Sequence, residues 1–350
     1  MRIAIVTRNA RVVGGVETYL DTVIPLLEAA GHEISILCEH DDQSTAQPIT
    51  RDASAPVWRI AEMGAQRSLE ALRRWQPDLI YSHGVNDLEI EARALALAPA
   101  MIFAHDYRAV CISGSKAFAS PKTRPCVRPL GMGCLANFYP RRCGGLNPIT
   151  MFEDYRGAVR RLALLRSVRA VLTGSEYVRA EYLRNGLAPA SVRCVGLPIV
   201  DRGPRQVTVA IGQDALASRP SRLLFAGRME PLKGGQILLD ALPIIASALS
   251  RPLVLTFAGA GGARVEWTRQ ADDISRREPS IRIEFVGWKD TNALNLLFDA
   301  SDLLVVPSLW PEPFGMVGPE AGMRGLPAAA FAVGGVPEWL TDGVNGALAR

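Results

Sequence analysis

The chain has 350 residues, more than one ordinary domain holds, so two or three domains are expected. Hydrophobic residues make up 48% of it, which excludes an intrinsically disordered chain, and 31 Gly with 24 Pro indicate many loops. The net charge of +4 is too small to require a nucleic-acid partner. It is unevenly distributed, because residues 1–106 carry a net −6, residues 107–202 a net +11 and residues 203–350 a net −1.

Composition also argues against a membrane-spanning or secreted chain. The longest uncharged apolar run covers residues 94–104 and contains Pro99, and it is far shorter than the ~18–20 residues that span a bilayer. The apolar run at the start of the chain is too short for a signal peptide. We therefore expect a cytoplasmic protein, in which six cysteines are more often free, ligating or reactive than disulfide-bonded.

Short apolar runs alternate with amphipathic stretches along the first half of the chain, which predicts alternating strands and helices. Strands are predicted at residues 2–7, 34–38, 78–82, 100–104, 170–173 and 192–197. Helices are predicted at residues 16–30, 65–75, 87–97, 151–167 and 175–184. Residues 107–148 interrupt the alternation with an irregular stretch rich in proline and glycine. Strands this apolar are typical of parallel sheets that are buried on both faces.

A second series follows a weakly apolar linker at residues 201–220. Its strands are predicted at residues 223–226, 253–258, 281–286, 303–306 and 328–332, and its helices at residues 235–249, 266–277, 293–300, 317–323 and 337–340. The two series predict an α/β fold of two Rossmann-like doubly wound domains. They cover residues 1–203, with the insertion 107–148, and residues 204–350. Because ligands bind at the carboxyl ends of such strands, the chemistry is expected in the loops that follow them.

The loop after the strand at residues 223–226 carries two cations. Arg228 and Lys233 stand just before Gly234 and the next helix. Arginine presents a planar fork of donors and lysine a point charge, and a helix N terminus attracts anions. The loop therefore suits a phosphate, although two solvated charges on a surface loop explain the same residues about as well.

The loop after the strand at residues 303–306 carries two carboxylates. Glu312 lies between two prolines, and Glu320 stands eight residues later in the first turn of the next helix. Carboxylates accept hydrogen bonds from sugar hydroxyls, but a glutamate in a first helical turn also compensates the helix dipole. After the last strand, Gly334 and Gly335 allow a close backbone approach to a ligand or form a plain turn.

Together with Gly14-Gly15-Val16-Glu17 after the first strand, these loops resemble retaining glycosyltransferase family 4 (glycosyltransferase group 1) of the GT-B fold. The resemblance covers nearly the whole chain, with four loops in the family's order. It implies two domains facing each other across a cleft, with the acceptor bound by the first and a nucleotide diphosphate-sugar by the second. The implied reaction is metal-independent transfer to a hydroxyl of a polysaccharide, a lipid-linked acceptor or a small-molecule glycoside, as in cell-envelope polysaccharide synthesis.

The resemblance also implies roles for single residues. It assigns Arg228 and Lys233 to the donor diphosphate, Glu312 to the donor sugar and Glu320 to the ribose hydroxyls. The further donor contacts that it implies come from Gly14, Gly15, Trp288, Phe314 and Gly315. It makes His105, Glu312, Arg228 and Lys233 the catalytic residues.

Two histidines end strands of the first domain, His83 after residues 78–82 and His105 after residues 100–104. A single histidine at a strand end is more often packed than catalytic. The resemblance places an active-site histidine at His105, near the transferred sugar and the acceptor, and leaves His83 the weaker candidate. Asp106 is interpreted as orienting His105, assisting the acceptor or capping a helix.

Two features depart from the family's pattern. Its Pro-Asn-Gly-x-Asp before the linker is Leu197-Pro198-Ile199-Val200-Asp201 here, and the chain stops at Arg350 where the family continues through helices that return to the first domain. The second domain is therefore expected to lack these closing helices. This keeps a non-catalytic nucleotide-sugar-binding subunit open as an alternative. A GT-B sugar-nucleotide 2-epimerase is the other alternative, against which the pair of glutamates argues.

Four of the six cysteines lie in the insertion: Cys111, Cys126, Cys134 and Cys143. Four thiolates suit a structural zinc ion, although the close Cys-x2–4-Cys pairs of such sites are missing. Two disulfides, or unligated thiols in a flexible segment, are the alternative interpretations.

The insertion and the helix after it also carry most of the excess positive charge. The basic residues are Lys116, Lys122, Arg124, Arg128, Arg141, Arg142, Arg156, Arg160, Arg161, Arg166 and Arg169. A basic amphipathic helix is typical of contact with an anionic membrane surface, while a solvated helix face is the plainer interpretation. We therefore expect an anionic acceptor, or peripheral contact with the inner face of a membrane.

Overall fold

The computed structural model describes residues 1–40, 47–52, 54–199, 219–249 and 251–350. The chain divides into two compact units, one of Met1–Pro121 with Cys126–Pro198 and one of Lys122–Pro125 with Ile199–Arg350. The predicted domain boundary at residue 203, and all but two residues of the predicted linker, lie outside the described residues.

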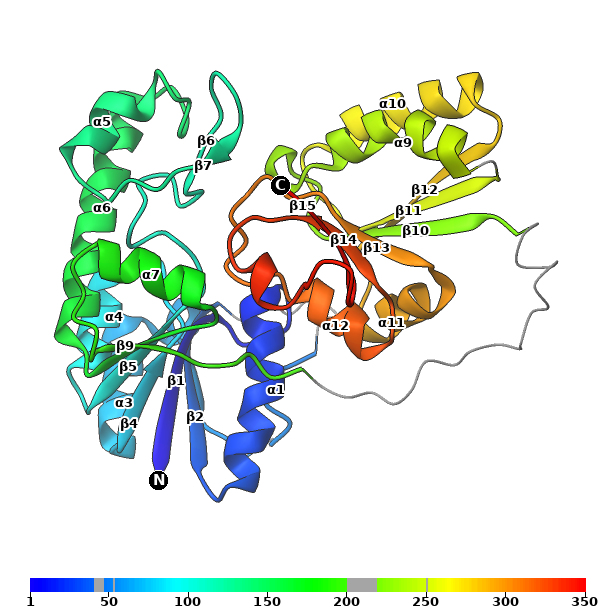
Figure 1. Ribbon diagram of the computed structural model, residues 1–350. Helices are drawn as coiled ribbons and strands as arrows, with labels where there is room; N and C mark the ends of the chain where they lie inside the picture. Colours follow the sequence, from blue (N-terminus) through cyan, green and yellow to red (C-terminus); the bar gives the residue numbers. More distant parts are fainter. Residues whose placement is uncertain (41–46, 53, 200–218, 250) are drawn as a thin grey trace. The chain divides into compact units, whose positions relative to one another are not determined.

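The first unit is built on a seven-stranded sheet in the order β3-β2-β1-β4-β5-β8-β9 (Figure 1). All neighbouring strands run parallel. The strands are β1 (Arg2–Asn9), β2 (Glu33–His40), β3 (Val57–Arg59), β4 (Leu79–Ser82), β5 (Ala100–Ala104), β8 (Ala170–Thr173) and β9 (Val192–Cys194). Strand order reverses between β1 and β4, which is the position where doubly wound sheets bind ligands.

Helices connect these strands, and polar side chains fix where several of them begin. They are α1 (Gly15–Ala29), α2 (Ile60–Met63), α3 (Ala65–Trp75), α4 (Leu88–Leu95), α6 (Pro148–Ser167) and α7 (Glu176–Arg184). Asp87 caps α4 by accepting hydrogen bonds from two backbone N–H groups. Ser175 caps α7 by accepting a hydrogen bond from one backbone N–H group. The helix predicted at residues 151–167 begins earlier, because Asn147 supplies a cap and Pro148 fits the first helical turn.

The insertion at residues 107–148 contains more regular structure than predicted. It includes the two-residue strands β6 (Ala117–Phe118) and β7 (Arg124–Pro125) and the helix α5 (Met132–Phe138). Ile112, Phe138 and Met151 form a small buried cluster that packs the insertion against α6. The elements are too short to leave a periodic signal in the sequence.

The second unit repeats the architecture with a six-stranded parallel sheet in the order β12-β11-β10-β13-β14-β15. Its strands are β10 (Ser221–Ala226), β11 (Leu253–Ala258), β12 (Ile281–Gly287), β13 (Leu303–Val306), β14 (Ala328–Phe331) and β15 (Gly346–Ala349). Its helices are α9 (Gly235–Leu249), α10 (Arg264–Arg277), α11 (Thr291–Ala300) and α12 (Val317–Met323), with 3-10 turns η1 (Pro231–Lys233) and η2 (Val336–Glu338).

Two predictions for the second unit were wrong in detail. The helix predicted at residues 337–340 is the single turn η2, and β15 was not predicted because its small residues resemble a turn. The other predicted strands and helices of both units are confirmed to within a few residues at their ends. Among the described residues, no helix is both long enough and apolar enough to cross a membrane.

Candidate active site

The loop after β10 presents Lys233 at the start of a helix. The backbone N–H of Met229 donates to the carbonyl of Ala260 at 2.8 Å, which holds this loop against the one that follows β11. Arg228 is exposed on the loop, and Lys233 ends η1 two residues before α9 begins. Lys233 therefore stands where a helix N terminus adds its own partial positive charge.

Gly234 brings that helix against the end of β13. Its φ of +75° lies in the left-handed region that favours glycine. A Cβ atom at Gly234 would lie 1.7 Å from the carbonyl oxygen of Pro307. The close approach of the two loops therefore requires glycine at this position.

The carbonyl of Leu232 joins the loop after β10 to the loop after β13. It accepts hydrogen bonds from the backbone N–H groups of Leu309 at 2.8 Å and Trp310 at 3.0 Å. The hydroxyl of Ser308 donates to the same oxygen at 3.3 Å. These bonds fix the positions of the side chains that follow on each loop.

Lys233 and Glu312 meet as an ion pair between the two loops. Lys233 Nζ lies 2.6 Å from Glu312 Oε1, and Glu312 is 5% exposed. Nζ also lies 4.6 Å from the centroid of the Trp310 ring, which is cation–π geometry. Both charged residues line a small pocket of about 40 Å³ at the ends of β10 and β13. The sequence predicted the two charges but not the contribution of Trp310.

The third predicted loop closes on the backbone of Glu312. The N–H of Gly335 donates to the carbonyl of Glu312 at 2.8 Å. A Cβ atom on Gly334, whose φ is +59°, would lie 2.2 Å from the same oxygen. All three predicted loops of this unit therefore meet at Glu312, one of them at its carboxylate and one at its backbone carbonyl.

The other predicted donor-binding residues of this unit also follow strand ends. Glu320 is half-buried in the first turn of α12. The carbonyl of Phe314 accepts a hydrogen bond from Trp339 Nε1 at 2.7 Å, and Gly315 has a φ of +86°. Trp288 follows β12 and is 62% exposed. Their roles in donor binding stay predictions.

The glycine loop of the first unit follows β1. Gly14 is the N-cap of α1, which begins at Gly15, and both glycines are exposed. The carbonyl of Gly14 accepts a hydrogen bond from the N–H of Thr18 at 3.0 Å. Their predicted contact with a diphosphate likewise stays a prediction.

His83 and His105 lie side by side at the ends of β4 and β5. His83 Nδ1 lies 2.8 Å from His105 Nε2, and one of the two nitrogens donates to the other. Burial lowers the pKa of His105 to about 3, with a contribution from the Arg8 cation. Burial and the neighbouring His105 also lower the pKa of His83. Both imidazoles are therefore neutral at physiological pH.

The Asp106 side chain bonds within the local turn, while its backbone carbonyl accepts a hydrogen bond from the Tyr182 hydroxyl at 2.9 Å. Its carboxylate accepts hydrogen bonds from the backbone N–H of Arg108 at 2.9 Å and from Arg108 Nε at 2.6 Å. Burial raises the pKa of Asp106 to about 6, against the opposing effect of Arg8 and Arg161. Asp106 therefore closes a local turn and caps no helix, because no helix begins among the described residues between β5 and β6, and its orienting or acceptor-assisting role stays a prediction.

The four cysteines of the insertion lie near one another. Each is half-buried and free of disulfides. Burial raises the pKa of Cys143 to about 11, and the other three thiols add to the effect. Within the described residues, no three His, Cys, Asp or Glu side chains form a group that could hold a metal ion. The structural zinc ion at Cys111, Cys126, Cys134 and Cys143 stays a prediction, which the metal content of the purified protein tests.

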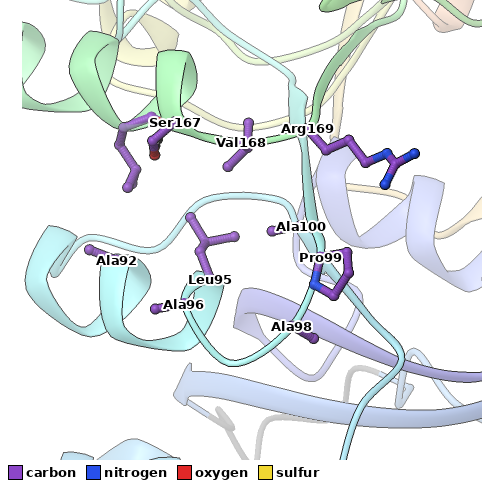
Figure 2. Close-up of a pocket in the computed structure, with 10 residues that line it drawn as sticks. Ala92, Leu95, Ala96, Ala98, Pro99, Ala100, Ser167, Val168 and Arg169 are labelled. Atoms are coloured by element: carbon purple, nitrogen blue, oxygen red, sulfur yellow. Dashed lines mark hydrogen bonds between the residues drawn. The ribbon is translucent and has the colours of Figure 1, made fainter.

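A larger pocket of about 500 Å³ lies elsewhere in the first unit, between α4 and the end of α6 (Figure 2). It is lined by small and apolar side chains, among them Ala92, Leu95 and Pro99, and Arg169 is its one charged residue. It lies at the start of β5, whereas His105 follows the end of that strand. This pocket lacks the polar groups that a diphosphate requires.

Two models of known protein families match the chain, one over each half. A family model described as Glycosyltransferase Family 4 matches residues 13–199, and one described as Glycosyl transferases group 1 matches residues 210–350. D-inositol 3-phosphate glycosyltransferase of Mycolicibacterium smegmatis is 35% identical over 158 residues, which cover 44% of this chain and 34% of that protein. The Streptomyces griseus protein of the same name is 32% identical over 185 residues, covering 49% and 34%. The matches thus span about a third of the length of these relatives.

Solved structures resemble the chain over nearly its whole length. Anabaena Alr3699/HepE in complex with UDP and glucose has a TM-score of 0.68 at 19% identity, covering 99% of this chain and 85% of that one. WaaG, a glycosyltransferase involved in lipopolysaccharide biosynthesis, has a TM-score of 0.67 at 16% identity, with coverages of 99% and 85%. These likenesses confirm the predicted α/β GT-B fold. Because the Glycosyltransferase Family 4 model matches more than half of its residues, the chain belongs to glycosyltransferase family 4.

Proposed function

We propose that this protein is a retaining glycosyltransferase that moves a sugar from a nucleotide diphosphate-sugar to an acceptor hydroxyl. The observation that carries the proposal is the Lys233–Glu312 pair at the convergence of three strand-end loops. A cation, a helix N terminus and a buried carboxylate in one place suit a ligand that combines phosphates with sugar hydroxyls.

The proposed donor site lies in the second unit. The diphosphate would be held by Lys233, Arg228 and the N–H groups that open α9. Transfer forms a bond between the acceptor oxygen and the anomeric carbon and breaks the bond between that carbon and the diphosphate oxygen. The hydroxyl proton passes to the leaving diphosphate, on which negative charge develops as the bond breaks. Fixed positive charge at that place lowers the barrier most in the transition state. With that charge supplied by side chains and a helix, the proposed transfer needs no metal ion.

The donor class is supported by the proteins that the chain resembles. Structures of Anabaena HepE contain UDP and UDP-glucose, and the curated relatives are named as glycosyltransferases. We propose a nucleoside diphosphate-sugar as donor and a glycan, lipid-linked or polyol hydroxyl as acceptor. Retention of the anomeric configuration is proposed from membership of the family.

A nucleotide screen with the whole chain tests this function. A diphosphate present at 100 times its Kd should raise the free energy of unfolding by about 2.7 kcal/mol, so UDP, GDP, ADP and dTDP are compared by thermal shift. The matching sugar nucleotides are then incubated with an acceptor panel, with and without EDTA. We expect acceptor-dependent nucleotide release that EDTA leaves unchanged. Binding without turnover would identify a non-catalytic subunit, and donor conversion without acceptor an epimerase.

Contact with an anionic membrane is a further part of the proposal. Met151, Leu162 and the other buried residues of α6 lie on one face of the helix. Another face of the helix carries exposed apolar side chains at a spacing of three and seven residues: Ile149, Phe152 and Val159. They are 66%, 53% and 43% exposed. The exposed Arg156 and Arg160 share that face, and the exposed Glu153, three and seven residues before them, lies at its edge and offsets one of the two charges. A stripe of large apolar and cationic side chains fits an interface of acyl chains and anionic headgroups.

Vesicle co-sedimentation tests the membrane contact. Each arginine near an anionic surface contributes about 1 kcal/mol to binding, so Arg156→Ala/Arg160→Ala should weaken binding to phosphatidylglycerol-containing vesicles by about tenfold or more. Phe152→Ser should weaken binding as well, whereas Val344→Ser, at a position that is 80% exposed in the second unit, should not. Equal binding of all variants would show that α6 is a solvated helix face.

A further inference from the structure

The contact between His83 and His105 raises a question of proton placement. His83 Nδ1 and His105 Nε2 lie 2.8 Å apart, so one nitrogen carries a proton and donates a hydrogen bond that the other nitrogen accepts. His83 is 5% exposed, whereas His105 is half-buried. Of the two rings, His105 is therefore the one that a ligand can reach.

The surroundings of His83 are aromatic. The rings of Tyr81 and Phe103 lie with their centroids 4.3 and 6.2 Å from the His83 ring, and the Tyr19 ring lies 5.6 Å away. The hydroxyls of Tyr19 and Tyr81 bond to each other at 2.7 Å. His83 Nε2 is buried and has no hydrogen-bond partner among the described residues. Its bond to His105 is thus the polar contact that orients the ring.

This arrangement favours one of the two proton placements. If His83 carried its proton on Nε2, a buried N–H donor would have no acceptor, which is the rarest kind of unpaired group. If the proton sits on Nδ1, His83 donates to His105 Nε2 and its bare Nε2 faces apolar rings. His105 must then carry its own proton on Nδ1, because each neutral imidazole has one.

We propose that His83 is a positioning residue that holds His105 in the Nδ1–H tautomer and fixes the orientation of its ring. His105 then presents a hydrogen-bond donor to a hydroxyl of the bound sugar or acceptor. The catalytic consequence rests on the function proposed above, whereas the tautomer is a property of the ligand-free protein.

Nitrogen-15 NMR of the ligand-free protein tests the proton placement directly. Two-bond ¹H–¹⁵N correlations distinguish a protonated from a bare ring nitrogen. We expect His105 to show a protonated Nδ1 and a bare Nε2, and His83→Phe to abolish this preference while keeping the ring packing. A protonated Nε2 on His105 in the unaltered protein would overturn the proposal.

Kinetics with matched variants test the consequence. In His83→Asn the side-chain amide can donate from about the place of Nδ1, so kcat should stay within about threefold of the unaltered enzyme. His83→Phe should lower kcat by about 10- to 100-fold with the donor KM unchanged, since a misplaced proton impairs the chemical step. Tyr81→Phe alters the same aromatic cluster without touching His105 Nε2 and should keep both kcat and the tautomer.

Equal losses in the Asn and Phe variants would leave a purely structural role for His83. An inactive unaltered protein would instead contradict the proposed function, and the NMR result would still stand.

Discussion

Replacing Lys233 with alanine is expected to lower kcat/KM for sugar transfer by about two to three orders of magnitude. The charge that Lys233 offers is fixed in place by the hydrogen bonds to the Leu232 carbonyl and by the ring of Trp310. Each preorganised charged or hydrogen-bonding group of this kind stabilises a transition state by about 3–4 kcal/mol. Without the lysine, the developing charge on the diphosphate would be met by mobile water instead.

Glu312→Ala is expected to have a similar effect for a different reason. The carboxylate is buried, and it holds Lys233 Nζ at 2.6 Å before any donor arrives. Glu312→Gln keeps the volume and a hydrogen-bond acceptor for the lysine, so it separates loss of charge from loss of position. We expect the glutamine variant to retain the fold and to lose most of its activity.

Steady-state kinetics with the donor identified by the nucleotide screen measure both effects. Arg277→Ala, an exposed charge in the last turn of α10, is the matched control and should leave kcat/KM unchanged. Circular dichroism at 25 °C verifies that each variant is folded. Full activity of Lys233→Ala or Glu312→Ala would contradict the assignment of the site.

Much of the fold followed from local patterns. Parallel strands buried on both faces are continuously apolar, and each is followed by a helix, so β1, β10 and β11 were recognisable one at a time. Small-residue strands such as β15 have no such signal. The insertion was predicted as irregular because β6 and β7 have two residues each and α5 only seven, too few for a repeat to stand out.

The candidate site was predictable in its charges but not in its contacts. Lys233 and Glu312 stand out because each follows a strand end in a loop rich in glycine or proline. That they touch depends on Gly234, where a side chain would collide with the Pro307 carbonyl, and on the Leu232 carbonyl. These contacts to the backbone join residues that are 73 or more positions apart in the sequence, which no spacing rule reports. The bond between His83 and His105 was missed for the same reason, since each histidine ends its own strand.

The insertion is anchored by a contact of this long-range kind. Lys116 Nζ lies 2.9 Å from Glu181 Oε2 on α7, and both side chains are 1% exposed. The same ammonium donates to the carbonyl of Arg128 at 2.5 Å. Nearby, the N–H of Leu130 donates to Asn185 Oδ1 at 2.7 Å, just beyond the end of α7. Within the sequence, Lys116 was one of many basic residues and had the appearance of a solvated charge.

Lys116→Ala is therefore expected to lower the free energy of unfolding of the protein by about 3 kcal/mol, because it removes the buried cation and leaves the Glu181 carboxylate paired only with Arg184, which is 40% exposed. Urea denaturation measures the change. Arg276→Ala is the control, since it breaks only an ion pair with Asp273 on the exposed face of α10, where the side chains are 75% and 51% exposed. Such surface pairs contribute about 0–1 kcal/mol.

A double variant separates the cost of an unpaired charge from the value of the pair itself. Lys116→Met/Glu181→Leu removes both buried charges at similar volume, and Arg184, the other partner of Glu181, is 40% exposed and can be hydrated. Replacing a buried ion pair with apolar residues is often neutral or stabilising, so the double variant should recover most of the stability lost in Lys116→Ala. If Lys116→Ala cost no more than Arg276→Ala, the buried pair would not anchor the insertion. If the double variant were as unstable as the single one, the hydrogen bond from Lys116 to the Arg128 carbonyl would be the contact that holds it.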